Sequence, residues 1–384
     1  MIDGFERGIE DITVQEIESV TVLKDAAALA LYGVRGANGV VYIKTKRGVV
    51  GKPVINFNYE FNFGTPNRLP KFVDGYTYAQ ALNEGLRNDG LSPRYSQREL
   101  DAFRDQTYPD FYPNVDWWDE ALRDHSYGDN VNFNIQGGSE KVRYFAQLNW
   151  LDDRGILKPV SDNEGYSGQL KYSKVNIRTN LDIQATKTTQ VQIGMLGNFA
   201  EHNRPGATVG NLFGALYQVP SGAFPVKTAN GLWGGNDIYS NNPVAYISGM
   251  GYARSQSRAL YADMNIMQDL SAITPGLSAS MQIGFDSNGS YWDNNTRTFA
   301  YESAVKGWDG EEDKYEKLRE ETALSFSSRV GSIVRRFTFG AQANYDKMWN
   351  DHKLNATLFY SMDKTSSQGQ NKSRAYMDVA GQAH

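Results

Sequence analysis

The chain has 384 residues, a net charge of −5 at pH 7 and no cysteine, and it is rich in tyrosine (23) and glycine (37). This mild charge, without a basic patch, excludes a nucleic-acid-binding protein. No apolar run reaches the roughly 18 residues that a membrane-spanning helix needs, so no such helix is predicted. The abundance of tyrosine and glycine is typical of strands and turns.

The first predicted unit is a strand, a short helix, a glycine turn and a second strand within residues 17–48. Residues 19–23 are rich in β-formers, and Asp25 is a plausible N-cap for a helix over residues 26–32. Gly33 suits the left-handed position that ends a helix. A turn at Gly36, Asn38 and Gly39 then leads into a strand over residues 40–45.

Strict alternation of apolar and polar residues begins after a short linker, residues 49–52. A period of two residues predicts strands with two chemically different faces. We expect nine such strands, over residues 55–63, 131–135, 142–150, 175–183, 191–199, 260–266, 277–285, 337–345 and 354–360.

The connections between these strands alternate in length, which is typical of outer-membrane barrels. Tight turns are expected at residues 137–140, 185–188, 271–276 and 350–353. Long loops are expected over residues 64–129, 152–169, 201–256 and 287–336, and Ser96 with Glu99 predicts a capping box that opens a helix to about residue 106. A soluble β-sandwich or propeller is the alternative, but it has no reason to place every long loop at one end.

In a membrane barrel the apolar face meets lipid and the polar face lines the lumen. Arg35, in the glycine turn, is then expected either to pair with a lumen carboxylate or to remain an exposed turn arginine. The candidate carboxylates on the polar faces of the strands are Glu60, Asp182 and Asp263.

Aromatic side chains in the long loops are candidates for contacts with a ligand or with a lid protein, because flat rings stack on sugars and on other proteins. The alternative is that these rings only pack the loops. The candidates are Trp233, Tyr239, Trp292 and Trp308.

No enzyme signature is present, so no catalytic residue, cofactor or metal ligand is predicted. The four histidines are scattered, and neither a nucleophile elbow nor a phosphate-binding loop occurs. Acidic pairs such as Asp152 and Asp153 are expected to be solvent-exposed carboxylates of the loops, and calcium binding is the alternative.

The residues from Leu23 to Ala26 and from Tyr32 to Val40, with Ile2-Asp3-Gly4 before them, resemble the end of the plug domain of SusC/RagA-type TonB-dependent outer-membrane transporters. The run Asp116-Trp117-Trp118-Asp119-Glu120 resembles the first barrel hairpins of that family. The plug-motif positions are Asp25, Gly33, Arg35, Gly36, Asn38 and Gly39.

The resemblance implies an all-β fold: a transmembrane antiparallel β-barrel, partial with about nine strands of a larger plugged barrel, and the C-terminal piece of an α+β plug domain. Residues 1–48 would belong to the plug, 49–52 to a linker and 53–384 to the N-terminal portion of the barrel. The absence of a signal peptide and the loop-like C-terminus at residues 380–384 suggest an internal piece of a longer protein that aggregates or needs detergent on its own.

The family also implies active import of a large nutrient, typically an oligosaccharide and sometimes a peptide, across the bacterial outer membrane. Its partners would be membrane lipid, a SusD-like lipoprotein lid and the TonB complex, which pulls on a box N-terminal to this chain. A TonB-dependent siderophore or cobalamin receptor and a non-transporting barrel, such as an adhesin, are the alternatives. The sequence does not identify the substrate.

Overall fold

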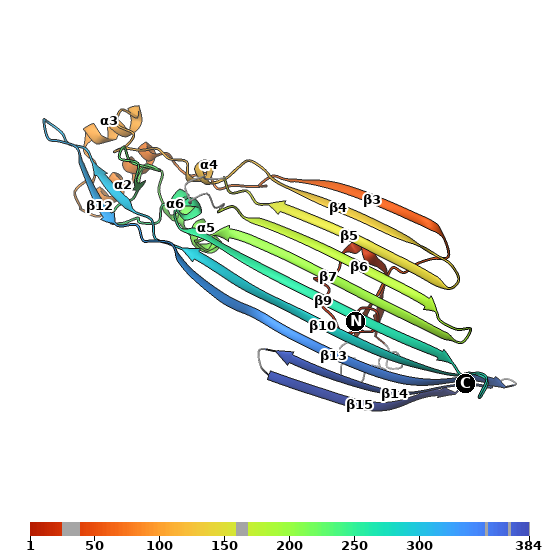
Figure 1. Cartoon of the computed structure of the whole chain (residues 1–384). Helices are drawn as coiled ribbons and strands as arrows, with labels where there is room; N and C mark the ends of the chain where they lie inside the picture. Colours follow the sequence, from red (N-terminus) through yellow and green to blue (C-terminus); the bar gives the residue numbers. More distant parts are fainter. Residues whose placement is uncertain (25–38, 159–167, 350–351, 368–369, 384) are drawn as a thin grey trace.

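The structure, a computed structural model, describes residues 1–24, 39–158, 168–349, 352–367 and 370–383. One long antiparallel sheet dominates it, and the helices gather at one end of that sheet (Figure 1). The expected helix over residues 26–32 and the turn that follows it lie outside the described residues.

The sheet has ten strands in the order β15-β14-β13-β10-β9-β7-β6-β5-β4-β3, so neighbours in space are neighbours along the chain apart from small inserted elements. The strands are β3 (Gly51–Gly64), β4 (Ser126–Gly138), β5 (Val142–Arg154), β6 (Lys171–Gln184), β7 (Thr189–Pro205), β9 (Gly251–Asp269), β10 (Leu277–Thr296), β13 (Ser325–Trp349), β14 (His352–Ser367) and β15 (Gln370–Ala383).

The sheet is polar where it is buried and apolar where it is exposed. On one face, Phe133, Leu148 and Ile177 lie side by side in register and are 39%, 45% and 53% exposed. On the other face, Gln147 and Arg178 face each other and are only 3% and 2% exposed. Water-soluble proteins show the opposite arrangement. We call these two surfaces the apolar face and the polar face.

All nine expected strands are present, but several are much longer than the alternation predicts. β10 continues to Thr296 and β13 begins at Ser325, so the loop between them is shorter than residues 287–336. β9 likewise begins at Gly251 and shortens the loop expected over residues 201–256. A tilted strand crosses a bilayer in about 9–11 residues. Where a strand extends beyond the bilayer, both of its faces can meet water. The hydrogen bonds between strands therefore continue while the alternation of apolar and polar residues stops.

The prediction of a loop at residues 380–384 is wrong for residues 380–383, which belong to a tenth strand, β15. β15 pairs with β14 from Leu354↔Ala383 to Ser367↔Gln370. The sequence of β15 has few large apolar residues, so the periodicity that identifies the other strands is weak there.

The described residues 1–24 and 39–48, here called the N-terminal segment, form a separate small unit. Its strands β1 (Ile17–Leu23) and β2 (Val40–Thr45) pair antiparallel, as predicted, and follow a short 3-10 helix, η1 (Val14–Glu16). The chain start adds to this hairpin, because the Asp3 amide donates to the Ile43 carbonyl at 3.0 Å. Ile2, Phe5 and Ile43 are buried.

The long connections lie at the end of the sheet where the helices gather, and their described residues, 65–125, 155–158, 168–170, 206–250 and 297–324, form what we call the loop cap. Ser96 and Glu99 make the predicted capping box at the start of α3 (Gln97–Asp105). In the described ranges, no helix combines the length and apolarity needed to cross a membrane. The cap contains α2 (Gly75–Asn88), α3 (Gln97–Asp105), α4 (Trp117–Ala121), α5 (Val209–Gln218), α6 (Pro243–Ser248), β8 (Trp233–Gly234), β11 (Tyr301–Val305) and β12 (Lys314–Arg319).

Candidate functional site

The N-terminal segment lies across the polar face of the sheet and contacts it through charged and amide side chains. These contacts reach from β5, where Gln147 donates to Thr13 at 2.6 Å, to β13, where Arg336 donates to the Glu6 carbonyl at 2.6 Å. We call the contacted strip of the polar face the seat. Most of the seat residues are buried although they are polar, so the segment shields them from solvent.

Arg7 makes the most elaborate of these contacts. Its guanidinium lies 2.6 Å from Asp263 on β9 and 2.8 Å from Asp286 on β10, and its side chain is 3% exposed. The same group lies over the rings of Phe5 and Tyr261. Two carboxylates and two rings thus enclose one cation, which is an arrangement that stabilises a buried arginine.

A second charged contact involves Glu16 and Arg178 on β6, both almost fully buried. Arg178 also lies 3.7 Å from Asp3. Asp3 in turn accepts hydrogen bonds from the amide and the hydroxyl of Thr45, at 2.9 and 2.6 Å. Arg178 therefore joins the sheet to the start of the N-terminal segment, at Asp3, and to the 3-10 helix η1, at Glu16.

The third charged contact is Arg47 to Asp182 on β6, at 2.6 Å. Two residues before Asp182 on the same strand, the side-chain amide of Asn180 donates to the Thr45 hydroxyl at 2.9 Å and to the Lys46 carbonyl at 2.6 Å. These bonds tie β2 and the residues after it to β6. Two of these charged contacts thus involve carboxylates of the sheet that the sequence singles out, Asp182 and Asp263.

Close packing supports the polar contacts at one position. Gly284 on β10 has no side chain, and a Cβ added there would lie 2.6 Å from Cε1 of Phe5. Phe5 is 4% exposed. The glycine therefore leaves the space that the Phe5 ring occupies.

Other predicted site residues are placed differently. Glu60 lies on β3, and its carboxylate accepts hydrogen bonds from Asn58 and Asn130 rather than from the described N-terminal segment. Gly39 has a φ of 89°, as a turn glycine would. The remaining plug-motif positions, Asp25, Gly33, Arg35, Gly36 and Asn38, lie outside the described residues, so the pairing of Arg35 stays a prediction.

The four loop aromatics all make contacts within the loop cap or beside it. Trp233 and Tyr239 pack against a buried apolar cluster that includes Leu212, Leu216 and Ile247. Trp308 donates to the Tyr112 hydroxyl at 3.2 Å, and Trp292 on β10 lies under the Arg204 guanidinium. Their contact with a ligand or a lid stays a prediction.

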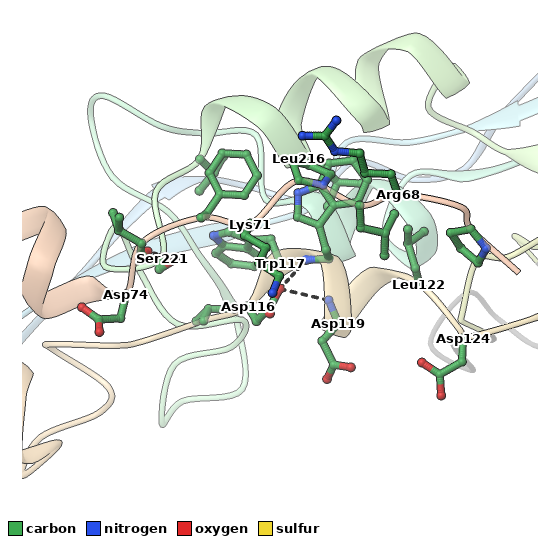
Figure 2. Close-up of a pocket in the computed structure, with 18 of the residues that line it drawn as sticks. Arg68, Lys71, Asp74, Asp116, Trp117, Asp119, Leu122, Asp124, Leu216 and Ser221 are labelled. Atoms are coloured by element: carbon green, nitrogen blue, oxygen red, sulfur yellow. Dashed lines mark hydrogen bonds between the residues drawn. The ribbon is translucent and has the colours of Figure 1, made fainter.

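The loop cap also contains a cleft of about 710 Å³ beneath the strap formed by residues 66–74. Figure 2 shows Arg68, Lys71 and Trp117 around it. Its floor is apolar and includes Trp117, which is 3% exposed, and Leu216. Asp116 lines it too, but its carboxylate caps α4 by accepting from the amides of Trp118 and Asp119.

Sequence reasoning missed the arginines that meet the seat, Arg7 and Arg47, and the buried Glu16. Arg7 and Glu16 lie in a stretch without periodicity, so no pattern marks them. A signal does exist on the sheet side, because Arg178, Asp182 and Asp263 are charged residues at positions of the polar face. In the described ranges, no group of three or more His, Cys, Asp or Glu side chains could hold a metal ion.

Comparisons with known proteins agree with this geometry. TonB-dependent receptor P26 of Formosa agariphila is 30% identical over 251 residues, which are 63% of this chain and 23% of P26. TonB-dependent receptor SusC of Bacteroides thetaiotaomicron is 31% identical over 158 residues, 41% of this chain and 14% of SusC. No protein-family model matches the chain.

Among solved structures, the RagAB peptide importer in its closed-closed state covers the whole chain with a TM-score of 0.67 and 18% identity. A structure of the RagAB peptide transporter gives 0.68 and 16%. In both cases this chain spans 45% of the solved chain. At these identities the likeness concerns the fold.

The inside-out sheet, the segment on its polar face and these relatives together support one class for this chain, the TonB-dependent receptors of the bacterial outer membrane. The similarity in sequence to SusC and the likeness of the fold to RagAB support the SusC/RagA type within that class. The chain spans less than a quarter of the length of the curated relatives P26 and SusC.

Proposed function

We propose that a receptor containing this chain actively imports a large nutrient, an oligosaccharide or a peptide, across the outer membrane. In this proposal residues 1–48 are part of the plug, 49–52 are a linker and 53–384 are barrel wall. The TonB complex supplies the energy by pulling on a box N-terminal to these residues, and a SusD-like lipoprotein closes over the loop cap.

One observation carries the proposal: the small N-terminal segment is held on the polar face of a sheet whose opposite face is apolar. The contacts in the seat are ion pairs and amide hydrogen bonds, which water can replace when the segment leaves. Three seat amides, those of Gln147, Asn176 and Asn180, already have a buried polar atom without a partner in the described part of the chain. Such a polar interface supports release under force better than a large apolar one does.

The test is to lock the segment onto its seat. The side chains of Thr45 and Asn180 meet at 2.9 Å, so the T45C/N180C pair can be bridged by oxidation to a disulfide and released again by a reductant. We expect bridging to abolish TonB-dependent uptake by a receptor that carries the pair, and the unbridged variant or T45C alone to retain it. Uptake that continues at the normal rate after complete bridging would contradict the proposal.

A further inference from the structure

A second cleft in the loop cap, of about 610 Å³, brings together three of the connections. Its lining residues come from the α2–α3 region, from residues 222–239 and from β11 with Lys306. Its size lies within the range of about 300–1,000 Å³ that is usual for ligand sites. Three loops that are far apart in sequence therefore build one concave surface.

The walls of this cleft are amphipathic. Tyr78, Tyr95 and Tyr239 line it and are half-buried. Burial, with the neighbouring Tyr239, raises the pKa of Tyr78 to about 12, so its hydroxyl stays protonated and can donate. Such rings offer apolar area and a polar tip with few rotatable bonds.

One wall of the cleft is an edge of strand β11 that is only partly paired with another strand. β11 pairs with β12 along its whole length, from Tyr301↔Arg319 to Val305↔Lys314. On its other edge β11 pairs with β8 only through Tyr301 and Glu302. Within the described chain, the edge therefore has no strand partner from Ser303 to Val305, and these residues line the cleft.

On this edge of β11 the backbone groups of every second residue point away from β12. The Gly235 amide donates to the Glu302 carbonyl at 3.1 Å across the edge, so the backbone groups of Glu302 point away from β12. Backbone groups of a strand alternate in direction with each residue. The N–H and C=O of Ala304 therefore point into the cleft.

Charged side chains of both signs line the cleft, and the carboxylates are in excess: Glu99, Asp110 and Asp237 against Arg94 and Lys306. Asp110 and Asp237 line it, and neither has an ion-pair partner among the residues that the structure describes. Lys306, which also lines it, is paired with Asp313 at 2.6 Å. The unpaired carboxylates complement an ammonium group, either the N-terminus of a peptide or a lysine side chain.

We propose that this cleft binds a short, positively charged peptide, which extends the β8-β11-β12 sheet as a strand beside Ala304. The inference rests on the proposed import function and selects its substrate class. A peptide in a strand offers the C=O and the N–H that complement the N–H and C=O of Ala304 on the free edge. A maltooligosaccharide has hydroxyl groups but no backbone amide that can pair with Ala304 as a neighbouring strand would.

The experiment uses the detergent-solubilised protein with two probes, a pool of random-sequence synthetic tetrapeptides and a pool of maltooligosaccharides of similar mass. Retained ligands are identified by mass spectrometry, and the affinity of a retained tetrapeptide is measured by calorimetry. We expect retention of tetrapeptides with an excess of lysine or arginine, and no retained sugar.

The substitution A304P removes the N–H that points into the cleft, and proline is tolerated on an edge strand whose N–H faces outward. We expect it to weaken the affinity at least tenfold, while the matched control A304V changes it less than threefold. Methylation of the tetrapeptide backbone nitrogen, which leaves the protein unaltered, should weaken binding equally. D237N should reduce the preference for positively charged peptides.

Three results would overturn the inference: retention of sugars instead of peptides, equal binding by A304P and A304V, or an Ala304 amide already protected from hydrogen exchange before ligand is added. TonB-dependent uptake of oligosaccharides with the first result would overturn the peptide site and leave the import function standing. Loss of all uptake from a correctly inserted receptor would instead count against the import function.

Discussion

Replacing Arg7 with alanine is the sharpest perturbation of the contact between the N-terminal segment and the sheet. Arg7, Asp263 and Asp286 have side chains that are 3%, 7% and 13% exposed, with separations of 2.6 and 2.8 Å. Removing one partner of a buried ion pair typically costs about 3–5 kcal/mol, because the remaining charge stays buried without compensation. Each 1.4 kcal/mol is about a factor of ten in an equilibrium constant, so the open population of the segment should rise at least about a hundredfold.

The measurement is hydrogen exchange of residues 1–16 in detergent micelles. The matched control is R98A, because Arg98 and Asp309 also form an ion pair at 2.9 Å but their side chains are 53% and 77% exposed. Exposed pairs contribute little to stability, so R98A should leave exchange of the segment unchanged.

A triple variant separates lost pairing from lost packing. R7M combined with D263N and D286N removes all three charges but keeps side chains of similar size, so it should recover much of the protection that R7A loses. Exchange in R7A equal to that in the parent protein would refute the view that this cluster holds the segment in place.

Two further predictions concern packing and pH. G284A should raise hydrogen exchange of the N-terminal segment, because the added Cβ would lie 2.6 Å from the Phe5 ring. The control is G289A on the same strand, whose added Cβ meets nothing closer than 3.5 Å and should leave exchange unchanged. Equal exchange in both variants would contradict the packing of Phe5 on β10. In the loop cap, hydrogen bonds from Lys306 and the Gly307 amide lower the pKa of Asp313 below its ordinary value of 3.8. The stability that this carboxylate contributes is therefore present above about pH 3.8 and is lost as the pH falls through the lower folded-state pKa. Proteolysis of residues 306–313 by an acid-active protease should rise over that window in the parent protein, and D313N should be cleaved readily at every pH; a parent protein without this pH dependence would contradict the assignment.

The strands could be predicted because a period of two residues reports the chemistry of both faces at once. Leu148 and Gln147 show this: neighbours in sequence, they lie on opposite faces, and the apolar one is exposed while the polar one is buried. The pattern fails where both faces share one environment. The outer part of β10, from residue 286 to Thr296, is strand without hydrophobic alternation.

Of the residues that meet in the seat, only those on the sheet could be predicted from the sequence. Asp182 and Asp263 stand out because they are acidic residues at positions of the polar face. Their partners Arg47 and Arg7 are ordinary cations in irregular stretches, and only the folded chain brings them together. Local signals within one element, such as the capping box at Ser96 and Glu99, needed no tertiary information and were predicted correctly.

Likewise, no sequence signal revealed the unpaired edge of β11. Whether Ala304 has a partner depends on the length of β8, which is two residues long and comes from another connection. Features that arise from the meeting of distant loops need the structure to be seen.

The central claim is that the apolar face of the sheet meets lipid and the polar face does not. The most direct test places a nitroxide label on single cysteines, L148C on the apolar face and S280C on the polar face of β10, in lipid vesicles; the chain has no other cysteine. The account predicts that the label at residue 148 collides mainly with oxygen, which partitions into lipid, and the label at residue 280 mainly with a water-soluble nickel complex. Equal shielding of residue 148 from both reagents, as in a packed protein core, would contradict the account.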